Sequence, residues 1–217
     1  MKKTRVYCSG PLFSPEERDV MESIAAVVEK AGHDTFLPHR DGLEQLALKL
    51  GKAPGAQSAT LGKANTFLRR AIFALDIFQL VDRCDAVVFN MNGRVPDEGA
   101  VVESAITFAL GRPLVIYKND ERTVFQGFDN PMVYELAPSG AHVSSIDKIP
   151  GALKDAIRRS GGRDKDDEAK LPPHLASVVD LGREVWRIWR VAKITPRNMN
   201  ELSLFLDGLR AVLRRNG

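Results

Sequence analysis

Two carboxylates lie in the first two turns of a predicted helix in the middle of the chain, at a spacing that is compatible with a role in catalysis. Residues 85–90 are predicted to form a buried strand, the polar loop after them ends in Asp97, and Glu103 follows. If Asp97 caps the helix, Glu103 lies in its second turn, where the helix dipole favours an ionised carboxylate by about 0.3–1 kcal/mol at most. We therefore expect Glu103 to be charged at neutral pH.

The residues around Glu103 are apolar, and an unpaired charge among them is costly. They are Val101, Val102, Ala105, Ile106 and Ala109. A glutamate in such a position either does chemistry, as a nucleophile, or forms a salt bridge with an arginine while Asp97 is only a helix cap. The spacing alone leaves both interpretations open.

Alternating strands and helices are predicted to position these carboxylates. Short apolar runs predict strands at residues 5–8, 34–37, 85–90, 113–117 and 141–143. Apolar residues at helical spacing, with caps and stops, predict helices at residues 14–31, 65–82, 99–110 and 149–159. Residues 38–62 are expected to be a long loop that covers a site. Repeated units of this kind predict an α/β fold with a parallel sheet flanked by helices, in which ligands bind beyond the carboxyl ends of the strands.

A change of composition predicts how the chain is divided. We expect an α/β domain over residues 1–160, a charged linker over residues 161–171, and a C-terminal helical extension over residues 172–217. The extension contains two amphipathic patterns, which predict a pair of helices that must pack on something apolar.

Composition excludes several classes of function. The chain has 217 residues, of which 44% are hydrophobic and 27% charged, and its net charge is only +3, so no dense basic surface for nucleic acid is predicted. No apolar run is long enough for a membrane span or the core of a signal peptide, so we expect a cytoplasmic protein. Cys8 and Cys84 form no metal motif and are expected to be reduced core residues. Because no glycine-rich phosphate loop is present, we predict no nicotinamide, ATP or metal cofactor.

Several short motifs, in order, resemble the nucleoside 2-deoxyribosyltransferase family. They are Tyr7 with Ser9-Gly10-Pro11-Leu12-Phe13, the Asp97, Gly99 and Glu103 arrangement, Ala109-Leu110-Gly111-Arg112-Pro113, and Asn130-Pro131-Met132. The resemblance covers roughly residues 4–160. It implies a flavodoxin-like, Rossmann-type sheet and a double-displacement mechanism on nucleosides.

The resemblance also implies a role for each matching residue. Glu103 matches the nucleophile that attacks C1′ of the sugar, where a carboxylate can both stabilise and trap an oxocarbenium-like species. Tyr7 matches the tyrosine that holds this nucleophile, although a strand tyrosine can equally be a packing residue. Asp76 matches the aspartate that contacts the base and would protonate the leaving nitrogen, but its spacing to Asp85 is one residue longer than in the family. Asp82 is the competing choice.

Asp97 matches the family position that contacts the sugar hydroxyls. A carboxylate there would repel a 5′-phosphate, so nucleosides are favoured over nucleotides. The residues predicted to bind the substrate are Ser9, Gly10, Pro11, Phe13, His39, Arg40, Asn92, Gly99, Asn130 and Met132. For His39 and Arg40 the alternative is a solvent-facing loop. In the family the Asn130 and Met132 segment reaches a neighbouring subunit's site, which implies a homo-oligomer with shared active sites.

Three functions remain open from the sequence. The first is transfer of the sugar from a (2′-deoxy)nucleoside to another nucleobase, and the second is hydrolysis of nucleosides or nucleoside 5′-monophosphates with the same nucleophile. The third is a non-catalytic nucleotide-binding module, which Glu103 and Asp76 in apolar surroundings argue against. The base preference and the choice between ribose and deoxyribose are not predicted.

Overall fold

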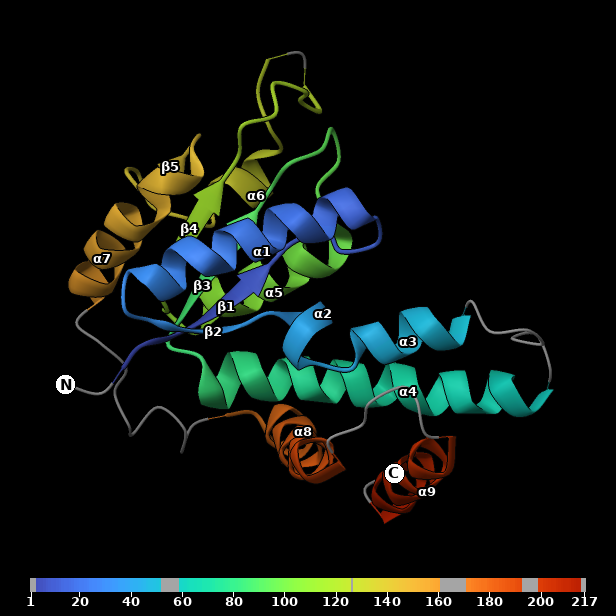
Figure 1. Cartoon of the computed structure of the whole chain (residues 1–217). Helices are drawn as coiled ribbons and strands as arrows, with labels where there is room; N and C mark the ends of the chain where they lie inside the picture. The colour runs from blue at the N-terminus through green and yellow to red at the C-terminus, as the bar shows by residue number, and fades with distance from the viewer. Residues whose placement is uncertain (1–2, 52–58, 126, 161–170, 193–198, 216–217) are drawn as a thin grey trace. The chain divides into compact units, whose positions relative to one another are not determined.

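The computed structural model describes residues 3–51, 59–125, 127–160, 171–192 and 199–215 (Figure 1). These residues group into two compact units, one of residues 1–37 and 83–167 and the other of residues 38–82 and 168–217. Within the described segments, no helix combines the length and the apolar character needed to cross a bilayer. The predicted linker falls mainly on residues 161–170, which lie outside the described residues, and the predicted domain boundaries stay a prediction.

The first unit contains a parallel sheet of five strands, which confirms the predicted fold class (Figure 1). The strands are β1 (Arg5–Ser9), β2 (Asp34–Phe36), β3 (Ala86–Asn90), β4 (Leu114–Tyr117) and β5 (His142–Val143). Their order is β2-β1-β3-β4-β5, the order of flavodoxin-like sheets. β1 therefore lies between β2 and β3, with Tyr7 opposite Val87 and Ser9 opposite Phe89 in the β1–β3 register.

Alternate residues of the strands face the two sides of the sheet. One side packs against α1 (Pro15–Lys30) and α7 (Ile149–Ser160), and its core includes Val6, Cys8 and Val88. The side chains of Tyr7 and Ser9 must then point to the opposite side, which is covered by α5 (Glu98–Ala109). The alternation thus brings α5, with its carboxylates, against two polar residues of β1.

Local signals in the sequence explain where α1 and α5 begin. Ser14 forms a capping box with Glu17, in which the Ser14 hydroxyl accepts from the Glu17 backbone and the Glu17 carboxylate accepts from the Ser14 backbone. Asp97 caps α5 by accepting a hydrogen bond of 2.8 Å from the Ala100 backbone N–H. Both caps were expected from the sequence.

The second unit is helical, and it corrects one expectation. Residues 38–62 were predicted to be a loop, but they contain α2 (Pro38–Asp41), α3 (Glu44–Gly51) and the start of α4 (Ala59–Phe78). Leu43 and Leu46 are buried at helical spacing, and this burial favours short helices that isolated peptides would not form. A π-helical turn, Gln79–Arg83, ends α4.

The predicted C-terminal helices are present as α8 (Pro173–Ala192) and α9 (Met199–Arg215). α8 packs closely on α4 at Gly182, where a Cβ atom would lie 2.0 Å from the Ala74 carbonyl oxygen. Trp189 packs edge-on against Phe205 and donates a hydrogen bond of 2.9 Å to the Asp41 carbonyl. The C-terminal extension therefore packs on the helices of residues 38–82.

Candidate active site

Glu103 is held by two hydroxyl groups of the central strand β1. Tyr7 Oη donates to Glu103 Oε1 at 2.7 Å, and Ser9 Oγ donates to Glu103 Oε2 at 2.5 Å. Tyr7 and Ser9 are two residues apart, so they share a face of the strand, and both are fully buried. Each carboxylate oxygen thus has one hydroxyl donor.

This cluster lies where parallel sheets of this order bind ligands. β1 and β3 are the neighbouring strands from which the chain turns to opposite sides of the sheet, and the crevice at their carboxyl ends is the usual binding position. Ser9 is the last residue of β1. Because Ser9 binds Glu103, this carboxylate lies at the carboxyl edge of the sheet.

The surroundings of Glu103 raise its pKa to about 7. Burial is the largest cause, the hydrogen bonds from Ser9 and Tyr7 act against it, and the negative charge of Asp97 adds to the rise. Among the described residues, no lysine or arginine pairs with Glu103, so the salt-bridge interpretation is wrong. The expectation that Glu103 is fully charged at neutral pH is also wrong, because loss of solvation outweighs the small effect of the helix dipole.

Asp97 is partly buried, and its Oδ1 is engaged by the α5 backbone. Gly99 follows two residues later, and a Cβ atom there would lie 3.2 Å from Asp97 Oδ1. A small residue at position 99 therefore leaves room for the cap. Asp97 is both the cap of α5 and a negative charge that acts on Glu103, and its contact with a sugar stays a prediction.

A set of polar contacts ties together the loops that follow β3 and β4. Asn92 and Asn119 exchange two hydrogen bonds of 2.8 and 3.0 Å, and the Gly93 N–H donates to Asp120 at 3.0 Å. Lys118 forms a largely buried ion pair of 2.9 Å with Asp129. These contacts fix the loop that leads into Asp97.

Lys118, Asn119 and Asp120 were not predicted as functional residues. They come directly after β4. Polar residues at the carboxyl end of a predicted central strand could have been used to find them from the sequence. The Arg122 guanidinium beside Asp120 holds the pKa of that carboxyl well below its usual range. Asn92 was predicted to bind substrate, but its side-chain amide is hydrogen-bonded to Asn119.

Gly10 follows Ser9 at the end of β1. A Cβ atom there would lie 2.7 Å from Met21 Sδ and 2.8 Å from Asn90 Cβ, so no larger residue fits without displacement. Pro11, the next residue, is partly buried. The side chain of Phe13 is 67% exposed, which leaves its ring available to a ligand.

In the second unit, His39 and Arg40 lie on α2. His39 is buried, so the solvent-facing alternative is wrong for this residue, whereas Arg40 is exposed and pairs with Asp41 at 3.0 Å. Their role toward a substrate stays a prediction.

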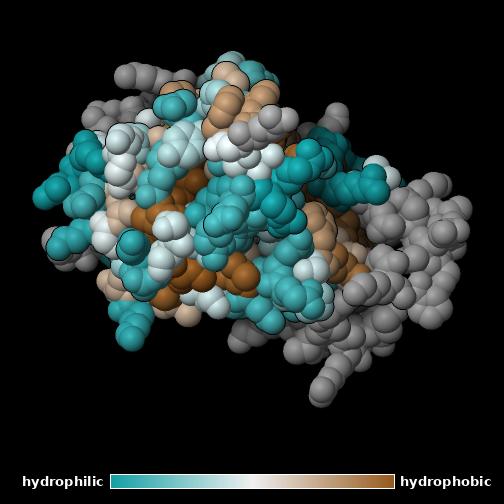
Figure 2. Space-filling model, turned by 90° about the horizontal axis from the view of Figure 1, so that it is seen from above, coloured by the Kyte–Doolittle hydropathy of each residue, from teal (hydrophilic) through white to brown (hydrophobic). Residues whose placement is uncertain are grey.

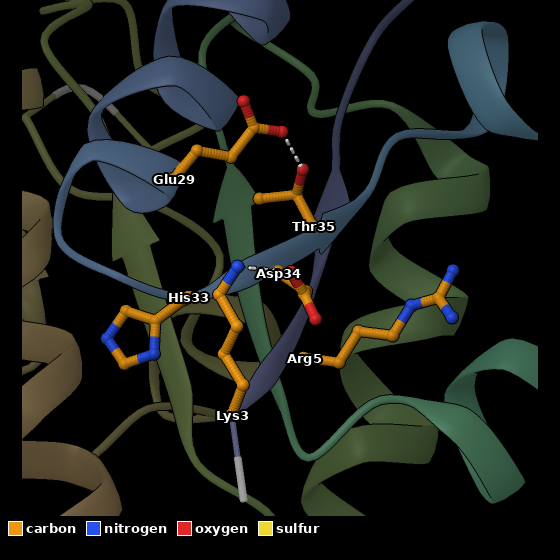
Figure 3. A pocket seen from close by; sticks show the side chains of 6 residues that line it. All are labelled: Lys3, Arg5, Glu29, His33, Asp34 and Thr35. Atoms are coloured by element: carbon orange, nitrogen blue, oxygen red, sulfur yellow. Dashed lines mark hydrogen bonds and ion pairs between the residues drawn. The ribbon is translucent and has the colours of Figure 1, made fainter.

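A pocket of about 460 Å³ lies at the other end of the sheet (Figure 3). Arg5 and Asp34, the first residues of β1 and β2, line it, whereas Glu103 is bound by the later residues of β1. Within the pocket, Lys3 pairs with Asp34 at 2.6 Å and Thr35 donates to Glu29. We therefore place the candidate active site at Glu103.

Comparison with known proteins assigns the chain to a family. The sequence model described as nucleoside 2-deoxyribosyltransferase matches residues 6–150. The chain belongs to the nucleoside 2-deoxyribosyltransferase family. A search of curated proteins found no match.

Two solved structures were found to be similar at low identity. A conserved protein from Enterococcus faecalis V583 is 18% identical with a TM-score of 0.48, and the match covers 70% of this chain and 98% of that one. The 2-deoxyribosyltransferase from Bacillus psychrosaccharolyticus is 15% identical with a TM-score of 0.42, and the match covers 68% of this chain and 90% of that one. Membership in the nucleoside 2-deoxyribosyltransferase family rests on the sequence match, and the fold rests on the sheet order.

A π-helical turn lies between Asp76 and Asp85, whose spacing was predicted to be one residue longer than in the nucleoside 2-deoxyribosyltransferase family. A π-helical turn takes more residues than an α-helical one, so Gln79–Arg83 absorbs the extra residue between Asp76 and Asp85. Asp76 is partly buried on α4, whereas Asp82 lies 3.9 Å from Arg183 of α8 in an ion pair. The match of Asp76 to the base-contacting aspartate of the family stays a prediction.

The Asn-x-Met segment of the nucleoside 2-deoxyribosyltransferase family begins the short helix α6 (Pro131–Tyr134). Asn130 caps this helix by accepting a hydrogen bond of 3.0 Å from the Met132 N–H. The Met132 side chain is 80% exposed. An apolar side chain presented in this way is available to another surface.

Proposed function

We propose that the protein cleaves the N-glycosidic bond of (2′-deoxy)nucleosides and transfers the sugar to another nucleobase. The observation that carries this proposal is Glu103, held by Tyr7 and Ser9 at the carboxyl edge of the sheet, where no lysine or arginine of the described part of the chain neutralises it. A merely structural glutamate in such surroundings would be expected to have a cationic partner. The family match over residues 6–150 supports the same chemistry.

In the first step, an oxygen of ionised Glu103 forms a bond to C1′ while the bond from C1′ to the base nitrogen breaks. The carboxylate is suited to this step because positive charge develops on the sugar in the transition state. The electron pair of the broken bond goes to the base, which takes a proton from Asp76. The products are a glutamyl sugar ester and a free neutral base.

In the second step, a nitrogen of a different base attacks C1′ and displaces the Glu103 carboxylate. The incoming base gives its proton to Asp76, so the acid is regenerated and no net charge is produced. Two displacements at the same carbon retain the configuration of the sugar. If water replaces the second base, the same ester is hydrolysed and free sugar is released.

Asp97 favours nucleosides over nucleoside monophosphates. Its charge already raises the pKa of Glu103, and an added 5′-phosphate would bring a further negative charge into the same region. We propose that Asp97 contacts the sugar hydroxyls instead. The non-catalytic alternative is disfavoured because a binding module gains nothing from a partly buried carboxylate that is held by two hydroxyl donors and has a raised pKa.

We propose that the protein acts as a homo-oligomer in which Asn130 and Met132 contribute to a neighbouring site. Val102 and Phe108 on α5 and Met132 on α6 are more than half exposed, and a subunit interface would bury such apolar side chains. In the view of Figure 2, apolar side chains reach the surface in patches among polar ones. Size-exclusion chromatography with light scattering should show an oligomer for the wild type and a smaller species for Met132→Glu; a wild-type monomer would contradict this proposal.

The reaction is tested by incubating the protein with a deoxynucleoside and a different free base. Chromatography should show a new nucleoside, whereas free sugar alone would favour the hydrolase. Glu103→Ala should abolish either product. Glu98→Ala is the matched control, because Glu98 is an exposed glutamate in the first turn of the same helix. Full activity of the Glu103→Ala variant would contradict the proposed function.

A further inference from the structure

Ser9 makes the shorter of the two hydrogen bonds to Glu103. Its Oγ lies 2.5 Å from Glu103 Oε2, against 2.7 Å between Tyr7 Oη and Glu103 Oε1. Ser9 was predicted to bind the substrate, but its side chain is fully buried. A serine hydroxyl has one proton to donate, and here that proton is directed at Glu103.

We propose that Ser9 is a positioning residue, whose hydroxyl fixes the second oxygen of Glu103 and favours its ionised, attacking form. This inference rests on the proposed function, in which Glu103 is the nucleophile. Tyr7 alone would hold one oxygen and leave the carboxylate free to rotate about its terminal bond, which has a broad torsional preference. With both donors, the plane of the carboxylate is fixed.

The hydroxyl of Ser9 should raise the reaction rate, because its effect on the ionised fraction of Glu103 outweighs its effect on the strength of the attack. Donors to a carboxylate weaken its attack slightly, but a protonated carboxyl cannot form the ester at all. Burial and the charge of Asp97 both push Glu103 toward the protonated form, and the hydroxyls of Ser9 and Tyr7 act against them. Asp97, at the start of α5, and Tyr7, on β1, are the titratable groups that face Glu103 among the described residues. At pH 7 the ionised fraction is therefore sensitive to the loss of one donor.

During the reaction the two donors remain useful. When one oxygen of Glu103 forms the bond to C1′, the other becomes the carbonyl oxygen of the ester and keeps its hydroxyl donor. When the acceptor displaces the ester, the same donor stabilises the returning carboxylate. Ser9 therefore acts through Glu103 in both steps and does not itself react.

The chain contains a matched control for this hydroxyl. Ser104 is the next residue after Glu103 and, like Ser9, is fully buried. Its Oγ has no hydrogen-bond partner among the described residues. Ser104→Ala removes a buried serine hydroxyl from the same region without removing a donor to Glu103. Ser9→Ala removes the donor, and Ser9→Cys replaces it with a weaker donor of similar shape.

The test combines two titrations of each variant. The first follows the Glu103 carboxyl by carbon NMR in the free protein labelled with ¹³C-glutamate, with the signal assigned by its absence in Glu103→Gln. The second follows kcat/KM for base exchange against pH. For Ser9→Ala we expect the NMR midpoint and the midpoint of the acid limb of kcat/KM to move up by about one pH unit, so that kcat/KM falls about ten-fold below the midpoint and approaches the wild-type value as the pH rises above it. Ser9→Cys should lie between, and Ser104→Ala should match the wild type.

Other results would overturn the inference. A Ser9→Ala protein whose two midpoints equal those of the wild type would show that the hydroxyl does not act on Glu103. A loss of activity that is equal at all pH values, with the NMR midpoint unchanged, would show a packing role only. If Ser9→Ala does not fold, Ser9→Cys decides by the same criteria. If the NMR midpoint moves but the wild type has no glycosyl-transfer or hydrolase activity, the proposed function fails while the control of Glu103 by Ser9 stands.

Discussion

Replacing Asp97 by asparagine should move the ionisation of Glu103 to lower pH. Asparagine is as good a helix cap as aspartate, so the hydrogen bond from the Ala100 N–H can be kept while the charge is removed. The Asp97 charge raises the pKa of Glu103, which is about 7. Its removal must therefore lower that pKa, and the ionised form should persist into more acidic solution.

The size of the shift follows from the geometry of α5. Six residues at 1.5 Å rise place Asp97 about 9 Å from Glu103 along the helix axis. At an effective dielectric constant of about 20, two charges at that distance repel by about 1.8 kcal/mol, and solvent and salt around the partly exposed Asp97 reduce this by roughly half. Since one pKa unit corresponds to about 1.4 kcal/mol, we expect a downward shift of roughly half a unit.

The assay is the pH dependence of kcat/KM for base exchange, with carbon NMR of Glu103 in the free protein as a measure independent of activity. The acid limb of the wild-type profile should have its midpoint near pH 7, because only ionised Glu103 attacks. In Asp97→Asn the half-maximum should lie roughly half a unit lower, even if KM rises through loss of a contact with the sugar. An unchanged or higher midpoint would refute this electrostatic reasoning.

Three further changes probe the support of the site and of the second unit. Tyr7→Phe keeps the aromatic ring but removes one donor to Glu103, so the midpoint of kcat/KM should rise by about one unit, and an unshifted profile would count against the hydrogen bond. Gly182→Ala places a methyl group against the Ala74 carbonyl and should lower the free energy of unfolding in urea by about 1–3 kcal/mol, whereas no change would argue against close packing of α8 on α4. Lys118→Met leaves Asp129 unpaired in a mostly buried position, so we expect lower thermal stability and a higher KM, and wild-type values for both would contradict the role of this ion pair.

Much of the sheet could be predicted from the sequence because its strands are short apolar runs separated by helical patterns. β3 is buried along its whole length, which is typical of a central parallel strand covered on both faces. Asp97 was identifiable as a cap because helix starts carry local signals, whereas Glu103 was predicted to be the nucleophile through its match to the family motif. The short helices α2 and α3 were missed, since their stability comes from tertiary packing of residues such as Leu43, which local propensity does not report.

The ionisation of Glu103 and the partner of Ser9 could not be predicted in the same way. Both depend on the register of β1 against its neighbours and on how closely α5 packs on the strand face. The Ser9 side chain could be assigned to one face by alternation with Tyr7, but only the packing of α5 brings its Oγ to 2.5 Å from Glu103. The raised pKa of Glu103 likewise comes from burial in the folded chain and not from its neighbours in sequence.

The most direct measurement is the mass of the protein after incubation with a deoxynucleoside and no acceptor base, followed by peptide mapping. If Glu103 attacks the sugar, the protein should gain the mass of one deoxyribosyl group on the peptide that contains Glu103, and Glu103→Gln should gain nothing. An adduct on another residue, or base exchange that persists in Glu103→Gln, would contradict the account.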